Sequence, residues 1–500
     1  MVDTLGQLNS RMQELKDLSG VIGLATWDQE TYLPPKGQGA RADQLATLQG
    51  LYHQRLTEPA LGELMGASLE SPGLTSDHRA MVRVLDAERR RALNVPTRLV
   101  RELAEAQSLG GATWREARKQ RRFEPFRASV ETLVALRREQ ADCIGHQGER
   151  YDALLDAYEP GMRVRRLTPV LAALEKKLIP LVNTLAEAAA SRADALAGRR
   201  FDLQAQWRFT FTLLEAMGFD LEAGRQDQSI HPFSGGTHPT DVRLTTHLHE
   251  DSPFPALFST IHEGGHGLYE QGFSPQHYRT PLAAAPSMGL HESQSRLWEN
   301  KVGRSEPFWR HHYPLFQAAM GEALAGVSLQ DFLRSANRVK RTLVRIESDE
   351  LTYNLHISLR YGLERALIAG DMEARDLPGE WNERSQALLG ITPADDLTGV
   401  LQDIHWSTGD FGYFPTYSLG NLYAASLWAA ARRALPGLEE GIAQGRLLPL
   451  RDWLREQIHS QGYRYGAEEL IEKVTGRGLT DEDFIAYLRA KYGALYDVSF

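Results

Sequence analysis

A chain of 500 residues, 42% of them hydrophobic, is long enough to bury a large core. Its net charge of −9 argues against nucleic acid or an anionic membrane as the main partner. The single cysteine, Cys143, excludes an internal disulfide framework. Residues 1–19 lack an apolar signal core, and no run approaches the ~18 apolar residues that span a bilayer. We therefore expect a soluble, cytoplasmic protein.

Helical periodicity dominates the chain. Apolar residues recur at spacings of three and four, with charged residues between them, in segments 12–18, 81–92, 133–143 and 167–190. Patterns typical of strands are confined to 207–213 and 242–248. Clusters of proline and glycine predict loops at 34–37, 71–73, 233–236 and 377–379. With no repeat or composition break, the chain is expected to form one mainly α-helical body with a very small β element.

The most informative segment is His262-Glu263-Gly264-Gly265-His266, which matches the pattern H-E-x-x-H. Residues four apart share one face of a helix, so the two imidazoles can hold one metal ion. The glutamate between them is then placed to act on water at that ion. Each of the two glycines costs about 1 kcal/mol inside a helix. We expect that another backbone or a substrate approaches them closely.

A catalytic zinc site needs a third protein ligand. The extended motif that ends in a third histidine is excluded, because Tyr269 occupies its glycine position and Gly272 its histidine position. Glu270 shares the face of the two histidines but lies about 12 Å along the axis from His262, too far to bind the same ion.

The next carboxylates are Glu292 and Glu299. Glu299 stands in an ordinary Arg-Leu-Trp-Glu-Asn surface pattern, so Glu292 is the better candidate for the third ligand. The alternative is that Glu292 forms a helical i,i+4 pair with Arg296. Spacing alone does not separate these two interpretations.

Further short motifs extend this signal over nearly the whole chain. They are Trp27-Asp28-Gln29-Glu30-Thr31-Tyr32-Leu33-Pro34, His231-Pro232-Phe233, Asp241-Val242-Arg243-Leu244-Thr245, His291-Glu292-Ser293-Gln294, Val344-Arg345-Ile346-Glu347-Ser348-Asp349, Gly399-Val400-Leu401-Gln402-Asp403-Ile404-His405-Trp406 and Gly412-Tyr413-Phe414-Pro415-Thr416-Tyr417-Ser418-Leu419-Gly420-Asn421. In this order they resemble the carboxypeptidase Taq family of zinc metallocarboxypeptidases. Val344, Ser348, Gly264 and Gly267 depart from the family pattern without removing a functional group.

The resemblance implies that His262, His266 and Glu292 hold one divalent metal, either Zn²⁺ or another ion such as Co²⁺. It favours Glu292 as a ligand over the simple helical pair. Glu263 is then the general base that accepts a proton from water and passes it to the departing amine.

The oxyanion that forms during peptide cleavage needs hydrogen-bond donors besides the metal. His405, Tyr413 and Tyr417 are the candidates, because a histidine and tyrosines supply such donors in related helical zinc peptidases. Asp403 either orients His405 or another ligand, or caps a helix.

An enzyme that cuts from the C-terminus must also recognise a free carboxylate, which the planar guanidinium of arginine binds well. Arg345 is the first candidate for this role and Arg243 the second, with His231 as a further residue lining the site. The structural alternatives are ion pairs of Arg345 with Asp349 and of Arg243 with Asp241.

The family resemblance implies a single domain over 1–500 that is split by a deep substrate groove. Helices within about 1–200 would form one groove wall, and 201–500 would carry the zinc site. The implied partners are peptides with a free C-terminus and a second copy of the chain in a homodimer. The alternatives are an endo-acting oligopeptidase or a dipeptidase on the same scaffold, or a non-catalytic helical scaffold.

Overall fold

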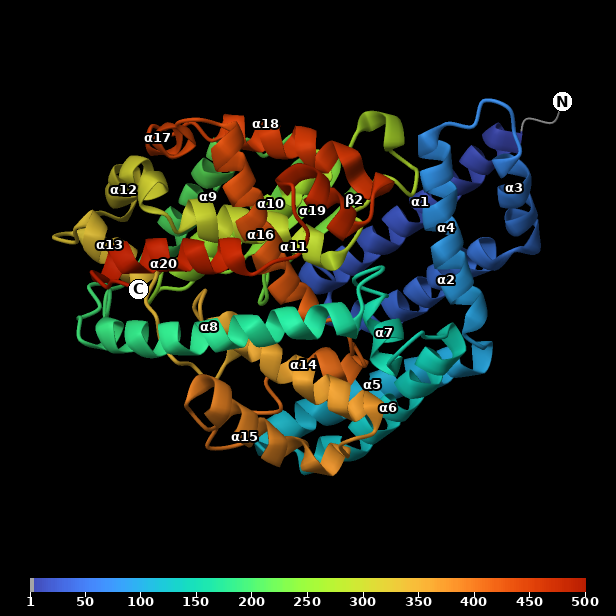
Figure 1. Ribbon diagram of the computed structural model, residues 1–500, viewed down its shortest axis with the longest axis horizontal. Coiled ribbons are helices and arrows are strands. Elements are labelled where there is room, and N and C mark those ends of the chain that lie inside the picture. Colours follow the sequence, from blue (N-terminus) through green and yellow to red (C-terminus); the bar gives the residue numbers. More distant parts are fainter. Residues whose placement is uncertain (1–3) are drawn as a thin grey trace.

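The computed structural model describes residues 4–500, which form an array of helices packed around one small sheet (Figure 1). The α-helices are α1 (Thr4–Thr31), α2 (Gln38–Thr57), α3 (Pro59–Leu69), α4 (Ser76–Asn94), α5 (Thr97–Gln120), α6 (Glu124–Ile144), α7 (Arg150–Leu155), α8 (Val164–Ala190), α9 (Leu203–Met217), α10 (Phe254–Gln271), α11 (Met288–Arg296), α12 (Glu306–Met320), α13 (Leu329–Ala336), α14 (Tyr353–Ala369), α15 (Leu377–Leu389), α16 (Pro415–Ala434), α17 (Leu438–Ala443), α18 (Leu448–Gln457), α19 (Ala467–Thr475) and α20 (Glu482–Tyr496). The predicted mainly α-helical body with a very small β element is confirmed.

The sheet has three strands, β1 (Gly224–Gln228), β2 (Ser234–His238) and β3 (Asp241–Thr246), in the order β1-β3-β2. β3 is parallel to β1 and antiparallel to β2, which places Gly224 and Gly236 on either side of Val242. The strand predicted at 242–248 is therefore confirmed as β3, with bounds that differ by one or two residues.

The strand predicted at 207–213 is wrong, because this segment lies within α9. Its buried residues Phe209, Leu213, Leu214 and Met217 recur at helical spacing and cover one face of that helix. The four helical segments predicted upstream all lie inside helices, namely α1, α4, α6 and α8.

Two of the four predicted loops are structured differently. Segment 233–236 runs into strand β2, and segment 377–379 opens α15 with Pro378 in its first turn. Proline is tolerated there because the first N–H groups of a helix have no intrahelical partner. Segments 34–37 and 71–73 are connections, the former including a short 3₁₀ turn (Pro35–Gly37).

Two hydrophobic cores hold the described residues together. The larger one runs from Ala117 to Tyr496 and includes β3 and α10. The smaller one lies among α1 to α4 and receives Leu282 from the segment that follows α10. Among residues 4–500, no helix combines the length and the apolar character that crossing a membrane requires.

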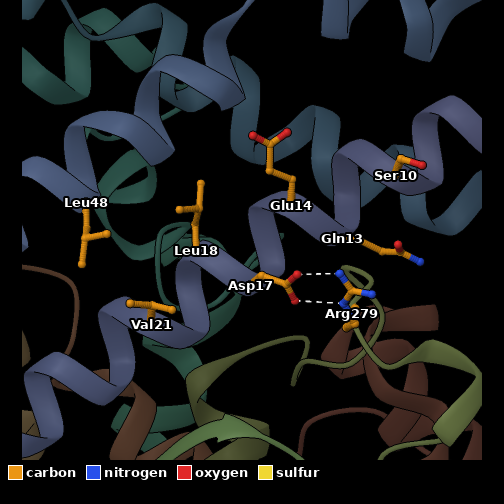
Figure 2. Close-up of a pocket in the computed structure, with 8 residues that line it drawn as sticks. All are labelled: Ser10, Gln13, Glu14, Asp17, Leu18, Val21, Leu48 and Arg279. Carbon is orange, nitrogen blue, oxygen red and sulfur yellow. Dashed lines mark hydrogen bonds and ion pairs between the residues drawn. The ribbon is translucent and has the colours of Figure 1, made fainter.

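The N-terminal helices are attached to the larger core beside the sheet, where α1 packs against β2. In the middle of α1, Asp17 accepts from Arg279, which reaches over from the segment after α10, at 2.9 Å (Figure 2). This ion pair borders a hollow of about 360 Å³ that α1 lines with Gln13 and Glu14. α1 therefore bridges the small core and the sheet.

Candidate metal centre

Helix α10 carries the H-E-x-x-H motif, and nearly every residue of this helix from Ala256 to Tyr269 is buried. A β-carbon on Gly265 would lie 2.7 Å from the Cα of Ser295, which is the backbone of α11. A β-carbon on Gly264 would instead meet the flexible ends of Leu214 and Met217 at 3.0 Å. The close approach predicted at the glycines is therefore made by a neighbouring backbone at Gly265 and by side chains of α9 at Gly264.

This approach of α11 to α10 brings three candidate ligands together. The ligand atoms of His262, His266 and Glu292 all lie within 4.8 Å of one another. Oε2 of Glu292 lies 3.5 Å from Nε2 of His262 and 3.4 Å from Nε2 of His266. Two imidazole nitrogens and one carboxylate oxygen form the donor set of a His₂Glu zinc site, so these residues fit a divalent ion.

The helical pair weighed as the alternative for Glu292 is also present. Nε of Arg296 donates to Oε1 of Glu292 at 2.6 Å, and the hydroxyl of Ser295 donates to Oε2 at 3.0 Å. The two interpretations are compatible, because each uses a different oxygen of the carboxylate as its main contact.

The interpretation of Glu299 as a surface residue is wrong. Glu299 is buried in a π-helical turn (η3, Leu297–Gly303) that continues α11. Its Oε2 lies 2.9 Å from Nδ1 of His262, and Oε1 accepts from Arg304 at 3.0 Å. Burial raises the pKa of Glu299, but Arg304, His262 and Arg296 outweigh it and hold that pKa below its usual range. Glu299 is therefore an anion that fixes the ring of His262 and leaves Nε2 directed at Glu292.

His266 is positioned differently. Its ring stacks on His291 with centroids 4.4 Å apart, and Nε2 of His291 lies 2.8 Å from Oε1 of Glu270. Within the part of the chain that the structure describes, Nδ1 of His266 has no hydrogen-bond partner. Glu270, excluded as a ligand by its distance along the helix, thus meets the centre through His291.

Glu263 lies beside the group and is buried. Burial raises the pKa of Glu263 to about 7, with the charge of Glu292 adding to the effect and His262 opposing it. The hydroxyl of Ser234 on β2 also bonds to Glu263 and lowers this pKa. The sheet edge and the candidate metal ligands therefore meet at this carboxylate.

A second cluster brings together the three predicted oxyanion donors. Nε2 of His405 lies 3.4 Å from the hydroxyl of Tyr417. The centroid of the Tyr413 ring lies 5.3 Å from the centroid of the His405 ring and also 5.3 Å from that of the Tyr417 ring. Burial lowers the pKa of His405 to about 4, so this imidazole is neutral near pH 7. Burial raises the pKa of Tyr413 to about 12, and the charge of Glu292 contributes to the rise. Tyr413 is thus close enough to Glu292, one of the candidate metal ligands, for that charge to raise its pKa.

Arg345 is buried next to this cluster, but its ion-pair partner is not the predicted Asp349. Its Nε and Nη2 donate to Asp403 at 3.0 and 2.8 Å, and its Nη1 donates to the hydroxyl of Tyr353 at 2.8 Å. Asp349 instead accepts from the backbone of residues 351 and 352 at the start of α14. The loop geometry turns Asp349 toward that helix and away from the arginine.

Asp403 also accepts from Nε of Arg360 at 2.6 Å. One half-buried carboxylate therefore serves two buried guanidinium groups, which leaves a surplus of positive charge below Tyr417. Neither role weighed for Asp403, orienting His405 or capping a helix, describes this arrangement, although its charge acts on the pKa of His405.

The remaining two predicted substrate residues lie on the sheet side. Arg243 donates to Asp241 at 2.8 and 3.1 Å, the ion pair weighed as its structural role, and stacks 4.7 Å from the ring of Trp27. His231 is exposed between β1 and β2, and its carbonyl accepts from Ser229. Neither residue lies in the cluster around Arg345.

Tyr353 connects the two clusters and was missed from the sequence. Its ring lies 4.5 Å from the guanidinium of Arg296, which holds Glu292, and its hydroxyl accepts from Arg345. It follows the arginine-aspartate motif by only four residues, so proximity to that motif was the available signal.

Comparison with known proteins settles the family. The model of the carboxypeptidase Taq (M32) metallopeptidase family matches residues 7–492. The chain belongs to this family. It is accordingly a metal-dependent carboxypeptidase, a hydrolase that acts on peptides.

Individual carboxypeptidases of the family align over almost their whole length. Thermostable carboxypeptidase 1 of Thermus thermophilus is 43% identical over 496 residues, and carboxypeptidase 1 of Bacillus subtilis is 35% identical over 486 residues, with 97% of each chain covered. The crystal structure of an M32 carboxypeptidase from Deinococcus radiodurans has a TM-score of 0.96 at 38% identity and covers 99% of this chain and all of that one. The carboxypeptidase fold thus extends over the entire described chain.

Proposed function

We propose that this carboxypeptidase uses one zinc ion held by His262, His266 and Glu292, with Glu263 as the general base. The observation that carries the proposal is the convergence of the three ligand atoms within 4.8 Å beside a buried carboxylate of the same helix. Another divalent ion such as Co²⁺ fits the same donor set.

A divalent ion held by these residues would polarise a peptide carbonyl and would lower the pKa of a water molecule, which then gives up a proton more easily and becomes a better nucleophile. Glu263 accepts the proton of that water and delivers it to the amine that leaves. Its burial suits this task, because a carboxylate whose pKa is raised toward neutrality can both accept and return a proton.

Negative charge develops on the carbonyl oxygen during the attack and needs preorganised donors. We assign this role to His405, Tyr413 and Tyr417, which share one buried cluster. The neutral state of His405 and the protonated state of both tyrosines leave an N–H or O–H available to donate near pH 7. The charge of Glu292 raises the pKa of both tyrosines, and it is the largest charge effect on Tyr413 only, which favours Tyr413 of the two.

The free carboxylate of the substrate is assigned to Arg345, with Arg243 and His231 as secondary candidates. The supporting feature is the surplus charge of Arg345 and Arg360 over their shared Asp403. A guanidinium that is already held in place by its own protein loses little conformational freedom when a carboxylate arrives.

The N-terminal helices within about 1–200 are proposed to wall one side of a substrate groove, with 201–500 carrying the metal. In support, α1 brings Trp27 against Arg243 on β3, while the neighbouring strand β2 brings Ser234 to Glu263. We also propose that the enzyme is a homodimer, following the behaviour implied by its family.

The test is a matched pair of peptides, one with a free C-terminus and one with a C-terminal amide. The purified zinc-loaded enzyme should release the last residue of the first peptide and leave the second nearly intact. Equal cleavage of both would instead identify an endo-acting oligopeptidase or dipeptidase. A preparation that holds no metal and ignores chelators would identify a non-catalytic scaffold.

A further inference from the structure

A cavity of about 580 Å³ lies outside the metal centre, among α12, α13, α16, α17 and α20. In Figure 1, α12, α13 and α17 lie at the left end of the molecule with α20 beside them, and α16 is nearer the centre. The volume falls within the range of about 300–1,000 Å³ that is usual for small-molecule sites.

Two helices contribute small apolar side chains to the wall of this cavity. Ala425 and Ala429 line it from α16, and Ala486, Ala490 and Ala494 line it from α20. The spacing of three to four residues on each helix puts these alanines on one face. The missing side-chain volume along both faces creates the space, and an apolar group can fill it.

Three cations line the cavity where it approaches the metal side of the protein. Lys301 and Lys491 share a single carboxylate, Glu350, at 2.6 and 3.0 Å. Arg304 donates to Glu299 at 3.0 Å, but Glu299 is shared with other cationic groups. The cations therefore outnumber the carboxylates that neutralise them.

The desolvation of these cations strengthens the argument for an anion. Burial lowers the pKa of Lys301 to about 8, against the opposing effect of Glu350. Burial also lowers the pKa of Lys491, and the charge of Arg304 lowers it further. A nearby negative charge would relieve both effects.

Carboxylates also line the cavity, and each of them is paired with an arginine, although Arg477 is shared between Asp483 and Glu482. Glu306 pairs with Arg310, Glu439 with Arg432 and Asp483 with Arg477. Among the described residues, none of these three carboxylates pairs with Lys301 or Lys491, whose two charges share the single carboxylate of Glu350.

We propose that this cavity is a second ligand site, which binds a small amphipathic carboxylate. The carboxylate contacts Arg304 and Lys491, and the apolar part lies along the alanines of α16 and α20 and against the buried Trp428. Two sources share this chemistry, a medium-chain fatty acid and a free amino acid with an apolar side chain.

The site is connected to the metal centre through two contacts. Arg304 donates to Oε1 of Glu299, and Oε2 of the same carboxylate lies 2.9 Å from Nδ1 of His262. A ligand whose carboxylate binds the guanidinium of Arg304 competes with Glu299 for that positive charge. The negative charge of Glu299 is then less neutralised, and its hydrogen bond with Nδ1 of His262 becomes stronger. Metal affinity then rises when the ligand binds, and by reciprocity ligand affinity rises with metal. This coupling rests on the proposed metal ligands, whereas ligand binding itself does not.

The experiment titrates the zinc-loaded enzyme with octanoate in a calorimeter, with octan-1-ol as the probe that lacks the charge. We expect octanoate to bind with a dissociation constant below about 1 mM and octan-1-ol not to bind. Lys491→Gln should weaken octanoate about tenfold or more, the effect of one charge-assisted hydrogen bond. Arg489→Gln, an exposed change on the same helix outside the cavity, should leave it unchanged.

Ala490→Phe fills the cavity without altering a charge, and because Ala490 is exposed the fold should tolerate it. This variant should also lose octanoate. L-phenylalanine in place of octanoate distinguishes the two sources: tighter binding of the amino acid points to a reaction product, and tighter binding of octanoate to a fatty acid.

Octanoate affinity that is unchanged in Lys491→Gln and Ala490→Phe would place the ligand elsewhere and overturn the site. A change in sedimentation coefficient of Ala490→Phe with no change in octanoate affinity would assign this face to an interface between copies, and would equally overturn it. For the coupling, octanoate should tighten zinc by a factor of two to five in a chelator competition, an effect of about 0.4–1 kcal/mol. If octanoate binds in a way that depends on Lys491 but leaves the zinc affinity unchanged, the proposed coupling is wrong and the ligand site still stands.

Discussion

Glu299 offers the sharpest test of the metal centre, because it contacts a proposed ligand without being one. Substitution Glu299→Gln keeps the volume and the hydrogen-bond acceptor but removes the negative charge that faces Nδ1 of His262 at 2.9 Å. The ring of His262 then becomes a weaker base and is held less firmly. We expect the variant to fold and to bind zinc more weakly.

The size of the effect follows from the contacts of this carboxylate. Loss of a group that orients a metal ligand typically weakens metal binding by a factor of about 10–100, or about 1.4–2.7 kcal/mol. Glu299→Gln should lie near the lower value, because the amide oxygen can still accept from His262. Glu299→Ala should lie near the upper value, and it also leaves the half-buried Arg304 without its partner.

The assay is zinc competition against a chelator of known affinity, with thermal unfolding of the metal-free proteins as the check on folding. Glu322→Gln, an exposed change, is the matched control and should behave as the wild type. Zinc affinity of Glu299→Gln within about twofold of wild type, in a variant that unfolds normally, would refute the role given to Glu299.

Four further measurements follow from the structure. Glu263→Gln should still bind zinc in a chelator competition, but its kcat should fall by a factor of at least about 10³, because the proton acceptor is gone. Glu292→Ala should lose both zinc binding and turnover. Normal zinc binding by Glu292→Ala would exclude Glu292 as a ligand. Gly265→Ala should lower the free energy of unfolding by more than about 2 kcal/mol and weaken zinc binding, because its methyl group would lie 2.7 Å from the Cα of Ser295. Gly264→Ala, which meets only flexible side-chain ends at 3.0 Å, should cost less than about 1 kcal/mol in urea unfolding, and an equal cost at both glycines would contradict the backbone argument. Burial raises the pKa of Glu159 from 4.5 to about 8, so the folded state holds a proton that the unfolded state releases, and stability should fall as pH rises through this window. Glu159→Gln should remove that fall and exceed the wild type at pH 9 by about 1–3 kcal/mol, whereas parallel urea midpoints of both proteins from pH 6 to 9 would show that Glu159 does not titrate there.

The fold was predictable where one face of an element meets the core and the other meets water. The apolar spacing within 133–143 and 167–190 is that of α6 and α8, each of which buries one stripe of leucines and valines. The same reasoning failed at 207–213, where the aromatic and β-branched residues of α9 favour a strand by composition but occupy a helix by burial.

The candidate site also has a part that could be predicted from the sequence and a part that could not. His262, Glu263 and His266 are set by the local geometry of one helix, which the sequence specifies directly. The partner of Arg345 is not local: Asp403 is 58 positions away, whereas the predicted Asp349 is four positions away and turns to the backbone of α14. Pairing by sequence distance assumed a helix through the arginine, but Arg345 lies in a short 3₁₀ turn.

Glu299 shows why the charge pattern near the proposed metal ligands is misleading. Two glutamates seven residues apart, interspersed with arginines, have the spacing of an exposed helical face with its ion pairs. In the structure all seven residues of η3 are buried, so polar and apolar positions are enclosed alike and no amphipathic pattern remains. The arginines that suggest a surface are instead the groups that keep Glu299 ionised in the interior. Because an exposed ladder and a buried network use the same residues at the same spacing, only the packing of α10 and α16 around this turn distinguishes them.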